Sequence, residues 1–120
     1  MLVYLVSSSR SVVCAHCLYG DSLAFRVKGL LGRQAMADGE GILLKPCNSI
    51  HMFFMKFAID AIFLDKENRI LHIAHTIKPW RISALILGAK SVLEVAAGTA
   101  VKNGLVTGEE LSFSIRQGCA

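Results

Sequence analysis

Apolar residues cluster most densely between Gly41 and Asp65, and their spacing there is typical of β-strands. The run Ile42 to Leu44 ends at Lys45-Pro46, where proline removes a backbone N–H and so disfavours a central ladder position. The next run, Ile50 to Phe57, would alternate its side chains between two faces if extended, and both faces are largely apolar. We therefore expect residues 50–57 to form a strand that is covered on both sides.

Two hairpins are predicted from the same kind of pattern. Ala61 to Leu64 and Arg69 to Ala74 are apolar runs joined by the turn formers of residues 65–68. Near the N-terminus, Leu2 to Val6 and Ser11 to Cys17 are rich in β-branched and apolar residues and flank a polar Ser-Ser-Ser-Arg turn. Each pair of runs should fold back on itself.

One helix is predicted near residues 22–32. Asp21 or Ser22 can cap its start, and Gly32 can end it. Its apolar positions fall at i, i+4, i+7 and i+8 and share one face, namely Leu23, Val27, Leu30 and Leu31.

The C-terminal half continues the strand pattern. It predicts an irregular connection over 76–83, a strand over 91–95, a helical turn over 97–103 and a last strand over 111–115. About eight short strands around one modest helix, without βαβ alternation, are typical of an antiparallel β sandwich or barrel. We expect a single mainly β domain over residues 1–120.

Composition narrows the function classes. The net charge of +4 comes from 13 basic residues that form no run, so we predict no nucleic-acid partner. Although 53% of the residues are hydrophobic, no uninterrupted apolar stretch reaches the length of a bilayer span, and we predict none. The first six residues lack a basic region before the apolar run, which favours a cytoplasmic protein. The four cysteines are too scattered for a disulfide framework, so reduced thiols are expected.

Several short motifs follow one another along the chain. They are Gly29-Leu30-Leu31-Gly32-Arg33, Gly39 to Leu44, Pro46-Cys47, Ser49 to Met55, Ile59-Asp60, Phe63-Leu64-Asp65, Lys78-Pro79-Trp80-Arg81 and Val92 to Gly98. In this order they resemble the prokaryotic family Domain of Unknown Function 192, over about Leu23 to Phe113. The resemblance implies a small β sandwich of jelly-roll type with a helix near the N-terminus. It also implies, by analogy of fold, binding of a sugar or another small ligand.

The sequence departs from this family in two respects. Many members carry an export signal that is not visible here, and the Cys14 to Cys17 pair is no part of the family pattern. The usual Gly-Asp near the end is Gly108-Glu109, a change that keeps the turn.

Polar residues in or near the motifs are the candidate ligand-binding residues. Trp80 could stack on a sugar ring, while carboxylates and the Arg81 guanidinium could bind hydroxyls or carboxylates. The set is His51, Asp60, Trp80, Arg81 and Glu94. The alternative is structural: Asp60 caps a turn, Arg81 pairs with Asp60 or Glu94, and His51 is a hydrogen-bonded histidine beside the core.

A metal- or thiol-dependent function is the competing hypothesis, with Cys14, Cys17 and Cys47 as its residues. Cys14 and Cys17 are three positions apart and point to opposite faces of a regular strand, so they would meet only at a turn or bulge. Tetrahedral zinc would need two more ligands. Small buried hydrophobic residues are the simpler interpretation of these cysteines.

No complete catalytic signature is present, so we predict a non-catalytic module without a cofactor. It would bind a small polar ligand, such as a carbohydrate, or act as an accessory domain. A protein-interaction scaffold is a further alternative. The methionines and phenylalanines of residues 36–57 are expected to fill the core, whereas an exposed patch of them would indicate a partner surface.

Overall fold

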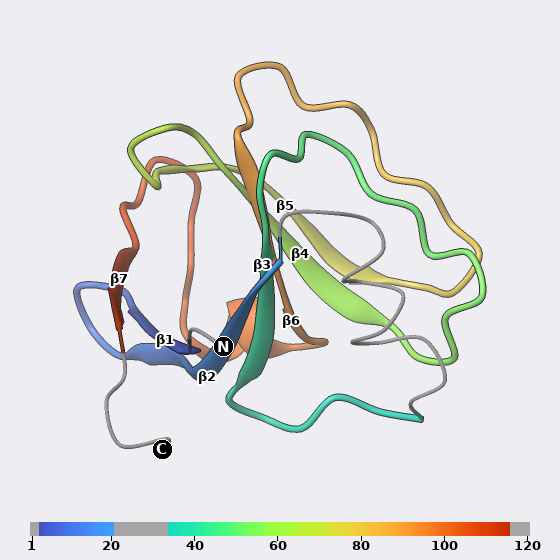
Figure 1. Cartoon of the computed structure of the whole chain (residues 1–120), viewed down its shortest axis with the longest axis horizontal. Coiled ribbons are helices and arrows are strands. Elements are labelled where there is room, and N and C mark those ends of the chain that lie inside the picture. Colours follow the sequence, from blue (N-terminus) through green and yellow to red (C-terminus); the bar gives the residue numbers. More distant parts are fainter. Residues whose placement is uncertain (1–2, 21–33, 116–120) are drawn as a thin grey trace.

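The computed structural model describes residues 3–20 and 34–115, so the helix predicted near 22–32 lies outside the described residues. The described residues form one β-rich body (Figure 1). In chain order its elements are β1 (Val3–Ser7), β2 (Val12–Gly20), β3 (Glu40–Leu44), β4 (Ile59–Leu64), β5 (Ile70–Ile77), β6 (Ser91–Ala96), α2 (Thr99–Lys102) and β7 (Ser112–Ile115).

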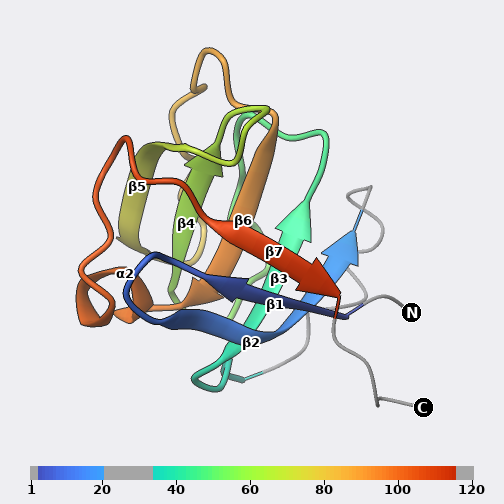
Figure 2. The same cartoon turned by 90° about the vertical axis from the view of Figure 1, so that its left-hand side faces the viewer.

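The strands form one mixed sheet in the order β5-β4-β6-β3-β2-β1-β7. Neighbouring strands are antiparallel except β2 and β3, which are parallel. Figure 2 shows β7, β1 and β2 running across the direction of β4 and β6, so the sheet bends over itself. The mainly β prediction is confirmed, with one mixed sheet that does not close into a barrel among the described strands; a jelly-roll topology stays a prediction.

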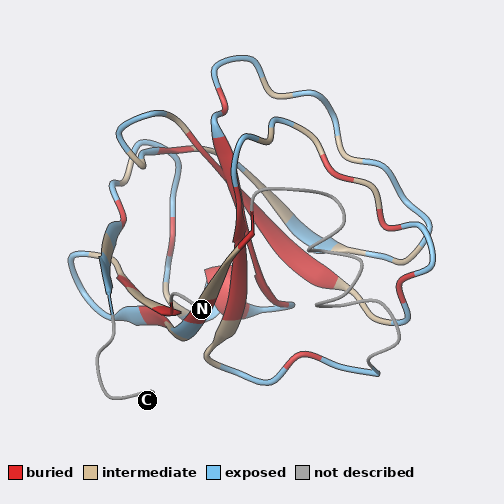
Figure 3. Cartoon of the chain, in the orientation of Figure 1, coloured by how far each residue is buried: buried red, intermediate tan, exposed pale blue. Residues whose placement is uncertain are grey.

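Two apolar cores lie on opposite faces of the central strands. The hairpin core contains residues of β1 and β2 together with Ile62 and Leu64 of β4. The loop core contains Ile59, Ala61 and Phe63 of β4 together with residues from the segment 50–55. Every residue of β4 and β6 is buried, as Figure 3 shows in red, because both of their faces are covered.

Most of the predicted local elements are confirmed. The pairs β1–β2 and β4–β5 are antiparallel hairpins, and β6, α2 and β7 lie where the strand, helical turn and last strand were expected. The turn after β4 is built on Asp65, whose Oδ1 accepts hydrogen bonds from the N–H groups of Arg69 (2.9 Å) and Glu67 (2.8 Å). The bond from Arg69, followed by that from Glu67, lowers the pKa of Asp65 below its usual value of 3.8.

The strand predicted over residues 50–57 is wrong. The segment is irregular and makes only an isolated bridge between His51 and Ile82. The burial of its apolar residues also does not follow the alternation of a strand. Met52 and Met55 are buried, whereas Phe54 is 67% exposed. The physical reason is that both edges of β4 are already paired, with β5 on one side and β6 on the other, so the preceding segment has no free strand edge there.

Candidate functional site

Two irregular segments hydrogen bond to each other and cover part of the loop core. We call residues 48–54 and 78–87 together the loop ribbon. Its backbone bonds run from Ile86 N to Asn48 O (2.9 Å) and from Ser83 N to Ile50 O (2.9 Å). At the other end, Met52 N donates to Arg81 O (2.7 Å) and Trp80 N donates to Met52 O (2.8 Å). In Figure 1 these segments are the green and yellow loops that run together along one side of the molecule.

Three aromatic side chains meet at one end of the ribbon. The Trp80 ring centroid lies 4.8 Å from that of Phe54 and 6.0 Å from that of Phe53. Phe53, Phe54 and Trp80 are 37%, 67% and 58% exposed. We call these three residues the aromatic platform. Its rings touch one another and still present surface to solvent.

The backbone of the platform is strained at two bulky residues. Phe54 has a φ of 65° and Trp80 a φ of 69°, in the left-handed region that side chains with a Cβ disfavour. Each such residue costs about 1–3 kcal/mol, and outliers of this kind cluster at functional sites. The ribbon therefore carries two aromatic residues in conformations that would suit glycine better.

Polar and cationic groups flank the platform. The His51 ring centroid is 4.8 Å from that of Phe53, and His51 Nδ1 accepts a long hydrogen bond from the Phe53 N–H at 3.4 Å. The Arg81 side chain is exposed, and so are those of Lys56 and Lys78. The structure thus brings three of the predicted residues, His51, Trp80 and Arg81, to one ribbon.

Sequence reasoning missed the part played by Phe53 and Phe54. It assigned them to opposite faces of a buried strand, and the structure places both on the surface. The one available signal was the pair of adjacent bulky aromatics beside His51 in a segment that also contains Lys56. An exposed patch of these residues is the arrangement expected of a partner surface.

Asp60 lies inside the fold, away from solvent. It is 0% exposed, and its carboxylate accepts three backbone hydrogen bonds: from Thr76 N (2.8 Å), Gly98 N (3.1 Å) and Ala100 N (3.0 Å). These bonds tie the end of β5 to the start of α2. This is the structural alternative for Asp60, in which the side chain satisfies backbone groups at turns.

Glu94 lies on the opposite face of the sheet from Asp60. In the β4–β6 register Asp60 is opposite Val95 and Ala61 is opposite Glu94, so the two carboxylates alternate to different faces. Glu94 is also 0% exposed. Neither carboxylate reaches a ligand on the aromatic platform in this conformation.

Cys14 and Cys17 lie on either side of a bulge in β2. Such an irregularity is the condition under which two strand residues three positions apart can point to the same face. The β1–β2 register shifts between Tyr4 and Val6, and both Cys14 and Cys17 join the hairpin core with 0% exposure. A hydrogen bond between the two thiols lowers the pKa of Cys14 and raises that of Cys17, and burial raises it further. The Cys14 thiol also lies 2.7 Å from where a Cβ at Gly41 would be, so a larger residue at position 41 would force the thiol to shift.

Cys47 is separated from this pair. It packs against the loop core, on the other face of the sheet, and its thiol donates to Ser49 O at 3.0 Å. Within residues 3–20 and 34–115 no three or more His, Cys, Asp or Glu side chains are grouped so as to hold a metal ion. The structure does not bring the three candidate metal ligands together.

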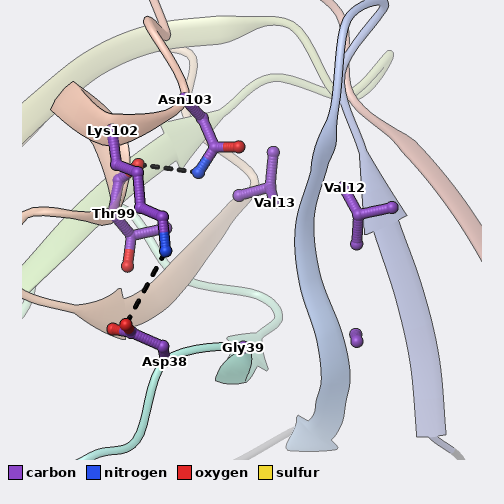
Figure 4. A pocket seen from close by; sticks show the side chains of 8 residues that line it. Val12, Val13, Asp38, Gly39, Thr99, Lys102 and Asn103 are labelled. Carbon is purple, nitrogen blue, oxygen red and sulfur yellow. Dashed lines mark hydrogen bonds and ion pairs between the residues drawn. The ribbon is translucent and has the colours of Figure 1, made fainter.

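A shallow hollow lies beside α2, away from these residues (Figure 4). It has a volume of about 270 Å³. Its lining residues are Val12, Val13, Ala15, Asp38, Gly39, Thr99, Lys102 and Asn103. Figure 4 shows Lys102 directed at Asp38, 3.7 Å apart, and both side chains are more than two-thirds exposed. Such an exposed ion pair contributes little, and none of the predicted site residues lines this hollow.

Comparison with known proteins identifies the family. The family model DUF192, described as "Uncharacterized ACR, COG1430", matches residues 8–113. The chain belongs to this family. The expected resemblance is therefore confirmed, and membership of DUF192 assigns no activity because the family is uncharacterised.

The chain is similar to curated proteins that carry one common name and, in fold, to a solved structure. A UPF0127 protein of Thermococcus sibiricus is 33% identical over 69 residues, which are 58% of this chain and 44% of the relative. A UPF0127 protein of Pyrococcus abyssi is 44% identical over 50 residues, 42% of each chain. The chain thus spans less than half the length of these curated relatives. A crystal structure of a protein of unknown function from Novosphingobium aromaticivorans matches with a TM-score of 0.75 and 22% identity, covering 92% of this chain and 83% of the other, and shows the fold alone.

The part of the chain that the structure describes contains no helix long and apolar enough to cross a membrane.

Proposed function

We propose that this DUF192 protein is a non-catalytic binding module that holds a small polar ligand containing a ring, such as a sugar, on the aromatic platform. The observation that carries the proposal is the pair Phe54 and Trp80. Both rings are more than half exposed, lie 4.8 Å apart and sit on left-handed backbone of two hydrogen-bonded segments. Strain held at an exposed aromatic pair favours a binding role over a purely structural one.

The platform residues and the predicted site residues have separate roles in this proposal. The faces of Trp80 and Phe54 stack on the apolar face of the ligand ring, and Phe53 extends the surface. The Arg81 guanidinium donates to hydroxyl or carboxylate oxygens, and His51 offers a polar group beside the rings. Buried Asp60 acts as a positioning residue, because its bond to Thr76 N fixes the chain just before the 78–87 segment. Glu94 lies buried on the loop-core side of the sheet and does not contact the ligand in this proposal.

The test uses Trp80, which is the chain's only tryptophan and therefore reports on the platform alone. Tryptophan emission and thermal unfolding are followed during titration with glucose, galactose, glucuronate and a nucleotide. We expect one class of ligand to change the emission saturably and to raise the unfolding temperature, because a ligand that binds only the folded state stabilises it. Phe54→Ala should weaken binding at least tenfold, since stacking surface is lost.

Val101→Ala is the matched control, because Val101 is 72% exposed on α2 and far from the ribbon in sequence. It should bind as the unchanged protein does. A saturable stabilisation that leaves Trp80 emission unchanged and survives Phe54→Ala would place the ligand elsewhere. No response to any of the ligands would favour the scaffold alternative.

Thiol chemistry is a second candidate function, favoured by one observation, the placement of Cys14 and Cys17 on either side of the register shift in β2 within the same core. Their complete burial argues for a packing role instead. Titration with a thiol reagent separates the two. Slow reaction of these thiols in the folded protein, unchanged by zinc, supports packing, whereas fast reaction or protection by zinc supports thiol chemistry.

A further inference from the structure

The loop ribbon has a second exposed patch, and its side chains are aliphatic. Ile82, Leu85 and Leu87 are 65%, 61% and 85% exposed. We call these three residues the aliphatic tip. Single exposed hydrophobic residues are ordinary on protein surfaces, but three within six positions of one loop mark an interaction surface. Aliphatic chains offer no ring face for stacking, so the proposed ligand platform gives them no role.

The backbone holds the tip outward. Ile86 is partly buried against the loop core, and its N–H donates to Asn48 O at 2.9 Å. Its neighbours Leu85 and Leu87 therefore point away from the core. Gly88, with a φ of +86°, then turns the chain, and Ala89 N donates to Ile86 O at 3.2 Å. The exposure of the two leucines follows from an anchored loop whose inward position is taken by Ile86.

The charged residues within the two segments that hold the ribbon are all cations. Residues 45–57 and 78–90 contain no Asp or Glu, although the whole chain has 9 acidic residues. Every Lys and Arg of the two segments is exposed: Lys45, Lys56, Lys78, Arg81 and Lys90. The segments that hold the aliphatic tip thus expose cations and contain no acidic residue, with Arg81 and Lys90 nearest to the tip in sequence.

We propose that the aliphatic tip docks the protein on an anionic lipid membrane surface. Leu85, Leu87 and Ile82 would enter the boundary between headgroups and acyl chains, where burial of apolar surface stabilises binding. The surrounding Lys and Arg would contact lipid phosphates and keep their charged ends in the headgroup layer. Trp80, at the other end of the ribbon, is of the residue type enriched at membrane interfaces. This inference does not rest on the proposed ligand site.

Charge favours a membrane over a second copy of the chain. A two-fold dimer through this surface would place the same patch on both subunits and so bring like charges together. An anionic bilayer instead complements the exposed cations of the two segments and accepts aliphatic side chains without a shaped pocket. The apolar tip and its cationic surroundings are both used in this arrangement.

The experiment is co-sedimentation of the whole chain with vesicles of phosphatidylcholine alone and with vesicles of equal phosphatidylcholine and phosphatidylglycerol. We expect binding to the anionic vesicles only, weakened by added salt. Leu85→Ser and Leu87→Ser should each lower the partition coefficient about tenfold, because inserted aliphatic surface is lost. Lys90→Gln should lower it a few-fold and reduce the dependence on salt.

Val101→Ser is the matched control, an aliphatic residue with 72% exposure outside the ribbon, and it should bind as the unchanged protein does. Absence of sedimentation with the anionic vesicles at low salt would overturn the proposal. Equal binding to neutral vesicles, or an equal loss in Val101→Ser, would overturn it too. A dimer detected by light scattering that Leu87→Ser dissociates would assign the tip to a second copy. Small-ligand titration of Trp80 emission in solution tests the ligand platform separately from all these outcomes.

Discussion

Two segments that follow each other in this chain have similar apolar content but differ in structure and burial. Residues 59–64 form β4, whose six residues are all buried between β5 and β6. Residues 50–57 are also apolar along most of their length, yet they form an irregular surface segment with Phe53 and Phe54 exposed. The apolar pattern of each segment permits a strand. The availability of a strand edge decided which of them became one.

The comparison also separates two ways of satisfying backbone groups. In β4 the N–H and C=O groups pair with regular neighbours on both sides. In the ribbon they pair with another irregular segment, as in the bonds between Met52 and residues 80–81. A regular ladder leaves little freedom for the side-chain direction, whereas the irregular pairing permits left-handed residues and outward-facing rings. Stability is therefore concentrated in the sheet, and candidate function in the ribbon.

The largest expected effect compares a phenylalanine from each segment. Phe63→Ala in β4 should lower the free energy of unfolding by about 3–5 kcal/mol, because the side chain is fully buried and leaves a cavity. Phe54→Ala in the ribbon should lower it by less than about 1 kcal/mol. Urea unfolding of both variants measures the difference. If both variants lost the same unfolding free energy, the ribbon would pack as tightly as β4 and the two segments would not differ in their contribution to stability.

Asp60 tests whether the sheet anchors the ribbon. Asp60→Ala leaves three N–H groups without their acceptor, one of them in a buried and two in partly buried hydrogen bonds, and should cost about 3 kcal/mol of unfolding free energy. Asp38→Ala is the control, because the Asp38 side chain is 81% exposed, and should be nearly neutral. Denaturant unfolding gives both values. A neutral Asp60→Ala would mean that the three N–H groups find other partners.

The strain at Phe54 is tested by two substitutions at the same position. Phe54→Gly should be more stable than Phe54→Ala by about 1 kcal/mol, since glycine adopts a φ of 65° without a Cβ clash. Neither variant should retain platform binding. Thermal unfolding compares them directly, and an alanine variant as stable as the glycine variant would show that the backbone there relaxes to negative φ.

The smallest expected effect concerns the turn between β4 and β5. The hydrogen bonds to Asp65 depress its pKa in the folded state, so the stabilisation is present above the unfolded pKa of about 3.8 and is lost as pH falls through the folded pKa. In Asp65→Asn the unfolding free energy should therefore fall slightly less as the pH is lowered than it does in the unchanged protein. Urea midpoints measured from neutral pH down to about pH 3 check this. If the pH dependence of the unfolding free energy were unchanged in this variant, Asp65 would not contribute to the loss of stability in acid.

Much of the secondary structure was predictable because its signals are local. Turn formers at 65–68 and the polar turn before β2 predicted two hairpins, and both are present. The condition that Cys14 and Cys17 meet only at a bulge also followed from strand geometry alone. The parallel β2–β3 pair and the exposure of Phe54 were not predictable, because both depend on which strand edges remain unpaired.

The candidate site shows the same division. The sequence by itself determined the mainly β class and the family, since these depend on residue type and order. The choice of His51, Trp80 and Arg81 as binding residues stays a prediction from residue type. Only the tertiary structure decided that Asp60 and Glu94 lie buried on opposite faces of the sheet while the aromatic and aliphatic side chains of the ribbon face solvent. Side-chain exposure depends on long-range pairing of segments, and a pattern of apolar residues specifies which residues can be buried but not which segment will cover them.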